Sequence, residues 1–358
     1  MTPVIQQNVS LRAFNTLALP STAEYFCSVS EHSQLLHALE FARTSALVVT
    51  IIGGGSNIVL AGDIPGLVIQ IDLRGVSHRY VTAAGNAAGD LANAVDVTFA
   101  AGENWHQQVL FCLDQGWYGL ENLSLIPGTM GAAPIQNIGA YGVELADRLI
   151  SLQALDRQSG ELVCFDRQSC EFGYRDSLFK HAGYDRYIIV DVTLRLSTKP
   201  EPNISYPALS AAVEAFCRRE GLTSEAITPR LVSNLVCEIR RQKLPDPALL
   251  PNAGSFFKNP LLKQPQLNAL LAQFEDMPNY PQPDGGAKIP AAWLIEQCGL
   301  KGAERGEVGV HDRQALVLIN RGQASGAELL ALAEEVRQSV EQLFAISLEI
   351  EPRIYGVN

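Results

Sequence analysis

The chain has 358 residues, of which 47% are hydrophobic and 18% are charged, and its formal net charge is −11. This length and apolar content suit two to three domains with ample core. The acidic balance disfavours a nucleic-acid-binding surface. It does not exclude an anionic small ligand, because such a ligand needs only a local cluster of cations and backbone N–H groups.

The sequence also argues against secretion, membrane insertion and metal binding. Residues 1–10 lack the basic and apolar regions of a signal peptide, and the most apolar run, residues 47–60, is interrupted by three glycines and Asn57. The seven cysteines are odd in number and form no C-x-x-C, and the six histidines show no ligand spacing. We therefore expect a cytoplasmic protein with reduced thiols and no metal site.

The first half of the chain predicts alternating helices and strands. Apolar spacing predicts an amphipathic helix over residues 31–43 and another helix over 103–115, with Gly116 as its stop. Short apolar runs predict strands over residues 47–52 and 67–71. Residues 74–96 are rich in Ala, Gly and Asn, and we interpret them as a surface loop or insertion.

The second half begins with a half-buried strand, because apolar and polar residues alternate over 190–197. A charged helix follows from about 229 to 242, and we place a domain boundary near 225–235. Later elements are a strand at 315–319, a helix at 327–344 and a last strand over 346–350. Since strands both alternate with helices and run in succession, the predicted class is α+β.

Two glycine-rich segments could bind a ligand through their backbone. Residues 51–57 run from a strand into Gly53-Gly54-Gly55, whose N–H groups could form a phosphate nest; a plain turn needing positive φ is the alternative. The Rossmann and P-loop patterns are absent. Residues 119–142 are dense in small residues and could lie against a flat, extended ligand. Interleaved residues such as Leu123 and Ile135 argue against the alternative of a flexible linker.

Two further segments carry side chains suited to catalysis. Ser255 stands in Asn-Ala-Gly-Ser-Phe-Phe-Lys-Asn, where Gly254 permits close backbone approach and the two aromatics can anchor the loop. A serine that merely satisfies a loop backbone is the alternative. Arg175, in Phe-Gly-Tyr-Arg-Asp-Ser, could grip a carboxylate bidentately, or make only a surface contact with Asp176. Glu351, taken alone, reads as a solvated strand residue.

Together these segments resemble the UDP-N-acetylenolpyruvoylglucosamine reductase (MurB) family, in its longer form with the Tyr-Arg-Asp-Ser segment, over nearly the whole chain. The resemblance implies a two-part FAD-binding domain of the vanillyl-alcohol-oxidase (PCMH) type, at residues 1–230 with subdomains at about 1–75 and 76–230. A substrate-binding α+β domain would follow at 231–345. The last strand, within 346–358, would return to the FAD domain.

The resemblance also implies the reaction. NADPH would pass hydride to a non-covalent FAD, which would reduce the enolpyruvyl group of the UDP-sugar to give UDP-N-acetylmuramate for peptidoglycan synthesis. Arg175 and Glu351 would stabilise the developing negative charge, and Ser255 would protonate the carbanionic carbon as general acid. We expect a monomer or a weak dimer, with no nucleic-acid or membrane partner.

The remaining site residues follow from the same resemblance. The positions expected at FAD are Gly53, Gly54, Gly55, Ser56, Asn57, Pro127, Gly128, Gly131, Ala132, Gln136, Asn137, Gly139, Tyr141, Gly142 and Arg353. Those expected at the UDP-sugar are Tyr174, Tyr206, Lys243, Asn259 and Gln314. Arg240 and Arg241 join Lys243 in a local cluster of cations that suits an anionic diphosphate.

Two alternatives stay open at this point. One is another FAD-dependent oxidoreductase of the same superfamily, such as an alcohol oxidase. Those enzymes often tether the flavin through His or Cys, and neither residue occurs in the two glycine-rich segments. The other is a non-catalytic sensor of a UDP-sugar, which would not require both Ser255 and Glu351.

Overall fold

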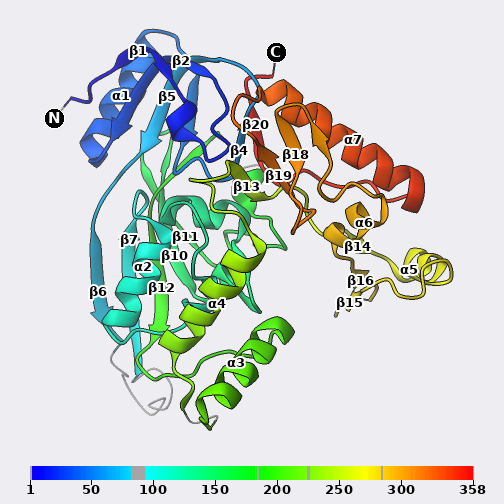
Figure 1. Ribbon diagram of the computed structural model, residues 1–358. Coiled ribbons are helices and arrows are strands. Elements are labelled where there is room, and N and C mark those ends of the chain that lie inside the picture. The colour runs from blue at the N-terminus through cyan, green and yellow to red at the C-terminus, as the bar shows by residue number, and fades with distance from the viewer. Residues whose placement is uncertain are drawn as a thin grey trace. The chain divides into compact units, whose positions relative to one another are not determined.

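The computed structural model describes residues 2–81, 93–181, 183, 185–223, 226–283 and 285–357 (Figure 1). The chain divides into two compact units. Unit 1 comprises Met1–Gln7, Glu24–Gly54 and Pro65–Gln242, and unit 2 comprises Asn8–Ala23, Gly55–Ile64 and Lys243–Asn358. Both units combine helices and strands, as the α+β prediction requires. No helix in the described ranges combines the length and the apolar character needed to cross a bilayer.

The first sheet, most of which belongs to unit 1, has four strands in the order β1-β2-β5-β3. Its strands are β1 (Gln6–Ser10), β2 (Thr22–Val29), β5 (Ile64–Ile71) and β3 (Val49–Ile52). Helix α1 (His32–Thr44) packs its buried face, which includes Leu35 and Ala38, in the same core as Leu67 and Ile69 of β5. The predicted helix and both predicted strands are confirmed here.

The second sheet of unit 1 has five antiparallel strands in the order β11-β10-β12-β7-β6. They are β11 (Leu162–Asp166), β10 (Leu149–Asp156), β12 (Tyr187–Ser197), β7 (Ala94–Ala100) and β6 (Val76–Tyr80). The alternation predicted along β12 is confirmed, since its apolar residues are buried and its polar ones half-buried. Thr193 pairs with Thr98 of β7, and their hydroxyls lie 2.8 Å apart.

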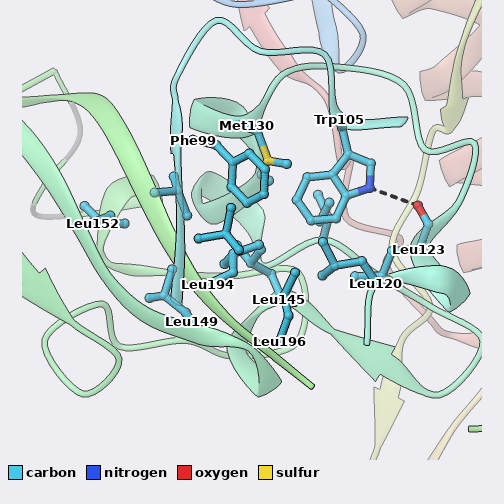
Figure 2. Close-up of a cluster of buried hydrophobic side chains, with 14 of the residues drawn as sticks. Phe99, Trp105, Leu120, Leu123, Met130, Leu145, Leu149, Leu152, Leu194 and Leu196 are labelled. Carbon is cyan, nitrogen blue, oxygen red and sulfur yellow. Dashed lines mark hydrogen bonds between the residues drawn. The ribbon is translucent and has the colours of Figure 1, made fainter. Parts of the chain in front are cut away.

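The core beside this sheet also holds the segment that precedes the second glycine-rich run. Figure 2 shows Phe99 of β7, Trp105 of helix α2 (Trp105–Asp114) and Met130 packed with leucines from several elements. The Trp105 indole N–H donates to the Leu123 carbonyl over 2.9 Å. Leu123 is fully buried, so residues 119–142 are anchored and are not a flexible linker.

Short elements and two helices complete unit 1. The short elements are η3 (Glu121–Leu123), η4 (Met130–Gln136), β8 (Gly139–Ala140), β9 (Val143–Glu144), η5 (Leu145–Asp147) and η6 (Leu178–Lys180). Helices α3 (Pro207–Glu220) and α4 (Pro229–Lys243) lie side by side (Figure 1) and share an apolar core that includes Leu209, Val232 and Val236. The helix predicted over about 229–242 is therefore confirmed.

Unit 2 is built on an antiparallel sheet with the order β13-β19-β18-β17, which contacts helix α7 (Gly326–Phe344; Figure 1). Its strands are β13 (Asn252–Ser255), β19 (Val317–Asn320), β18 (Val308–Val310) and β17 (Glu304–Arg305). The other elements are η1 (Arg12–Phe14), α5 (Gln264–Leu271), α6 (Ala291–Gln297), the small sheet of β14 (Leu261–Leu262), β16 (Ala287–Lys288) and β15 (Tyr280–Pro281), and the parallel pair β20 (Arg353–Tyr355) and β4 (Ile58–Leu60).

Two sequence predictions are corrected. Residues 74–96 are not simply a loop, because strand β6 occupies Val76–Tyr80 and β7 begins at Ala94; residues 82–92 lie outside the described residues. All five side chains of β6 are exposed, so no apolar pattern marks this edge strand. Residues 346–350 also form no regular strand: Ile346 and Leu348 are buried, but only Ile350 makes an isolated bridge.

Gly131 packs so closely that an alanine should destabilise unit 1. Its N–H donates to the Ala101 carbonyl over 2.8 Å, and an added Cβ would lie 2.5 Å from the Ala101 Cβ and 3.0 Å from its Cα. We predict that Gly131→Ala lowers the free energy of unfolding by about 1–3 kcal/mol, the usual effect of overpacking, measured by urea denaturation. Gly173→Ala is the control, since the nearest atom to its added Cβ would be the Asp176 Cβ at 3.5 Å, an ordinary van der Waals distance. Equal stabilities of the two variants would contradict the prediction.

Candidate functional site

The two glycine-rich segments meet within unit 1. Strand β3 ends at Ile52, and the backbone of Gly53 and Gly54 then lies against Gly128 and Thr129. A Cβ on Gly53 would lie 2.7 Å from the Thr129 hydroxyl, and a Cβ on Gly54 would lie 3.3 Å from the Gly128 Cα. Neither glycine has a positive φ, so the requirement here is space and not backbone conformation.

The surface around this contact consists of small residues open to solvent. Gly54, Pro127 and Ala132 are exposed, and Gly128 and Gly131 are half-buried. Two backbone hydrogen bonds fix the start of helix η4. Met130 N–H donates to the Glu103 carbonyl and Gly131 N–H donates to the Ala101 carbonyl, each over 2.8 Å. A rigid strip of exposed backbone with almost no side chains suits a flat ligand that needs close approach.

Asn137 organises the end of this strip. It adopts a left-handed conformation with φ +45°, and its side chain is buried. The amide nitrogen donates to the Glu144 carboxylate over 2.8 Å and to the Gly173 carbonyl over 3.1 Å, and the amide oxygen accepts from Ala146 N–H over 3.0 Å. The side chain therefore joins the glycine-rich strip to the Tyr174–Ser177 segment.

Arg175 sits at the tip of a tight turn and reaches back to the strip. Backbone bonds between Gly173 and Asp176 close the turn, and Arg175 has φ +53°. Its guanidinium donates to the Gly139 carbonyl over 2.5 Å and to the Asn137 carbonyl over 3.5 Å, and it lies 5.2 Å from the centre of the Tyr174 ring. The structure thus brings this arginine to the glycine-rich segment.

Tyr141, four residues after Asn137 in the same segment, lies beside Tyr206. Their rings are edge-to-face with centroids 5.4 Å apart. Asn122 donates to the carbonyls of Tyr141 and Asn203, each over 2.8 Å, and so ties the strip to the segment before α3. Gly142 has φ +81°, and a Cβ there would lie 3.8 Å from that of Tyr206.

Ser255 occupies the end of a bulged strand in unit 2. Asn252 pairs with Ile319 and Ser255 with Val317, so two residues of β13 oppose one of β19. Gly254, with φ +70°, occupies the bulge and donates its N–H to the Asn252 side chain over 2.9 Å. The bulge gives Ser255 its orientation, and the buried rings of the next two residues hold it there.

Glu351 is brought beside Ser255 by antiparallel pairing. The Glu351 N–H donates to the Phe256 carbonyl over 2.9 Å, and Lys258 N–H donates to the Glu349 carbonyl over 2.9 Å. The Lys258 ammonium also pairs with the Glu349 carboxylate at 2.5 Å. Residues more than ninety positions apart in the sequence therefore form one short ladder next to the proposed acid.

The remaining predicted residues of unit 2 lie in four separate places. Gln314 lies in the turn between β18 and β19, and Asn259 accepts a hydrogen bond from Ala291 N–H at the start of α6 over 2.9 Å. Asn57 accepts from Arg353 N–H over 3.1 Å, which brings two residues predicted to bind FAD into contact. Lys243 is exposed at the last position of α4.

Comparison with known proteins gives the family. The family described as FAD binding domain matches residues 23–166, and the UDP-N-acetylenolpyruvoylglucosamine reductase C-terminal domain matches residues 246–355. The chain is 49% identical over 350 residues to the reductase of that name from Bordetella pertussis, covering 98% of this chain and 95% of the relative. The chain belongs to the UDP-N-acetylenolpyruvoylglucosamine reductase family. The reductase from Pseudomonas aeruginosa is 47% identical over 351 residues, covering 98% and 99% of the two chains.

Solved structures support the same fold. The Thermus caldophilus MurB structure matches with a TM-score of 0.64 at 22% identity, covering 99% of this chain and 100% of the other. A vanillyl-alcohol-oxidase-type flavoprotein from Myceliophthora thermophila matches with a TM-score of 0.50 at 12% identity, covering 94% and 73%. The predicted fold class, an FAD-binding domain of this type followed by a second α+β domain, is confirmed.

Sequence reasoning missed Thr129, whose hydroxyl faces the Gly53 backbone. Thr129 stands between Gly128 and Met130 in the second segment. It contacts Gly53 only because the fold brings the first segment against it, and the sequence does not show this approach. Sequence reasoning also grouped Arg240, Arg241 and Lys243 as one cluster. Within unit 1, Arg240 has a buried Nε atom whereas Arg241 is exposed. The two adjacent arginines therefore differ in burial, and their identical charge could not predict this difference.

The close approach at Gly54 predicts a loss of cofactor binding on substitution. A valine at this exposed position would push against Gly128 and cover the strip with methyl groups. We expect Gly54→Val to purify with much less FAD than the wild type, measured as flavin absorbance per mole of folded protein. Gly54→Ala, which adds only one methyl group, should lose less. A valine variant with a full complement of FAD would contradict a cofactor role for this strip.

Proposed function

We propose that this enzyme reduces UDP-N-acetylenolpyruvoylglucosamine to UDP-N-acetylmuramate with NADPH as hydride donor. The observation that supports the proposal is the ladder of unit 2 that pairs Glu351 with Phe256, the residue after Ser255, since it holds the two residues that we propose as acid and proton donor in one element. The names of the relatives, at 47–49% identity over nearly the full chain, support the same substrate. The proposal includes a cytoplasmic location.

The described residues fit FAD as a cofactor. The Gly53–Gly54 backbone packs against Gly128 and Thr129 with no room for a Cβ on Gly53, and Gly54 and Ala132 leave a surface of small exposed residues. Gly53, Gly54, Gly128, Gly131 and Ala132 would hold FAD through backbone contacts. When bound, FAD carries hydride from NADPH to the enolpyruvyl double bond.

The protein's own groups would control the charge and the proton. Hydride addition to an enol ether conjugated to a carboxylate leaves negative charge on the adjacent carbon and the carboxylate. Arg175, held on the Gly139 carbonyl, supplies a guanidinium that can stabilise this charge, and Glu351 supplies an acidic group for the same charge. Ser255 Oγ donates its proton to the carbon. The rigid bulge that holds Ser255 provides the preorganisation that this step needs.

The function is tested with the purified holoenzyme under anaerobic conditions. NADPH should bleach the flavin absorbance, and the enolpyruvyl UDP-sugar should restore it with stoichiometric formation of UDP-N-acetylmuramate. Recovery of the absorbance with oxygen and an alcohol substrate, but not with the UDP-sugar, would favour an alcohol oxidase. Absence of bleaching by any reductant would favour a non-catalytic sensor.

Ser255→Ala should separate the two half-reactions. Bleaching by NADPH needs no proton from this hydroxyl and should keep its wild-type rate. Recovery with the enolpyruvyl substrate should slow by roughly 10²–10⁴-fold, the usual contribution of a positioned acid, measured by stopped-flow absorbance. Ser325→Ala is a control of the same chemistry, since its hydroxyl caps helix α7. Equal slowing of both half-reactions in Ser255→Ala would contradict the proton-donor role.

A further inference from the structure

Arg240 is a half-buried arginine with a buried Nε atom. This Nε atom has no hydrogen-bond partner, and no ion pair involves Arg240 among the described residues. Burial lowers the pKa of its guanidinium, and Arg175 lowers it further, whereas Tyr141 and Cys237 act in the opposite direction. Arginine remains charged in proteins, so unit 1 holds a partly buried cation for which the described residues supply no carboxylate.

The groups around Arg240 do not neutralise it. Burial raises the pKa values of the Tyr141 phenol and the Cys237 thiol, so both stay neutral at physiological pH. The pKa of His106 is lowered by burial and then by Arg241 and Arg240, which keeps that imidazole neutral. The Tyr141 hydroxyl also has no hydrogen-bond partner among the described residues. Two donors, a phenol and a guanidinium, therefore lack acceptors in the same place.

Helix α4 aims Arg240 at the glycine-rich strip. Ser233, Cys237 and Arg240 follow one another at spacings of four and three and so share a helix face. The Ser233 hydroxyl lies 2.8 Å from that of Ser124, which precedes the strip. Arg241 is exposed, although its charge also acts on His106 and Cys237. The favourable field at a helix C-terminus acts on both arginines, so it does not explain why Arg240 is the more buried of the two.

We propose that Arg240 and the Tyr141 hydroxyl bind the carboxylate of the UDP-sugar together with Arg175, and so select the carboxylate-bearing sugar. This inference rests on the proposed function, which gives the ligand its carboxylate. A carboxylate is acceptor-only and matches the fork of a guanidinium. Arg240 lies close enough to Arg175 for mutual repulsion, and a bound anion would relieve this repulsion as well as satisfy both donors.

Stability without substrate separates a ligand-binding role from a structural one. Arg240→Gln removes a partly buried charge whose Nε atom has no hydrogen-bond partner, so the variant should melt at a higher temperature than the wild type in the absence of UDP-sugar. Arg241→Gln removes an exposed charge from the next position and should leave the melting temperature near the wild-type value. A lower melting temperature for Arg240→Gln would indicate a structural role and overturn the proposal.

Binding of two UDP-sugars to the holoenzyme tests the ligand, with calorimetry as the readout. UDP-N-acetylmuramate carries the carboxylate, and UDP-N-acetylglucosamine shares the diphosphate but lacks it. Arg240→Gln should raise the Kd for the first roughly 10- to 100-fold, the range for a lost hydrogen bond to a charged group, and barely change that for the second. Tyr141→Phe, which keeps the ring, should show a smaller shift of the same selectivity. Arg241→Gln should not show it.

Other outcomes would overturn the proposal. Equal weakening of both UDP-sugars in Arg240→Gln would assign the arginine to the diphosphate. A loss of FAD affinity by the apoprotein, with UDP-sugar selectivity kept, would assign it to the cofactor. Wild-type selectivity between the two UDP-sugars in both Arg240→Gln and Tyr141→Phe would show that these residues do not bind the carboxylate. A wild-type protein that binds neither sugar would contradict the proposed function itself and this inference with it.

Discussion

The close approach of the Gly53–Gly54 backbone to Gly128 and Thr129 is the constraint on which the candidate cofactor surface depends. The same segment is pressed from its other side, where Gly131 lies against Ala101 just after β7. Residues 128–131 are therefore held between the ends of two strands, at distances that leave no room for a Cβ on Gly53 or Gly131. Because this close packing requires glycine, no side chains cover the backbone on its solvent side. A surface of exposed backbone can accept a flat ligand.

In unit 2, the main feature of the candidate site is the fixed position of one hydroxyl group, that of Ser255. The buried rings of Phe256 and Phe257 hold the segment by burial alone, and the bulge at Gly254 turns Ser255 relative to the rest of β13. Glu351 arrives through a backbone hydrogen bond, and Pro352 then ends the pairing, so that Arg353 donates to Asn57 instead. The placement of Glu351 next to the Ser255 segment thus follows from backbone pairing.

The sequence predicted elements wherever burial follows a period, and failed where it does not. Helices α1, α2, α4 and α7 bury one face each, and apolar spacing predicted α1 and α7. Strand β6 exposes every side chain and is defined only by its pairing with β7. Ile346 and Leu348 alternate because they are buried, yet hydrogen bonding defines a strand, and that segment makes only an isolated bridge. Residues that touch across the chain, such as Gly53 and Thr129, carry no local signal.

The electrostatics of unit 1 show why Arg240 stands out. Arg195 grips the buried Asp96 with two hydrogen bonds of 2.7 and 2.9 Å, and Arg186 does the same for Asp156 at 3.1 and 2.8 Å. The chain has 38 acidic residues against 27 basic ones, so a carboxylate partner for a buried arginine is not scarce in this composition. An unpaired buried charge opposes folding. The presence of Arg240 next to Tyr141 is explained when the anion that pairs with it belongs to the ligand. The favourable free energy of this ion pair then contributes to ligand binding and not to folding.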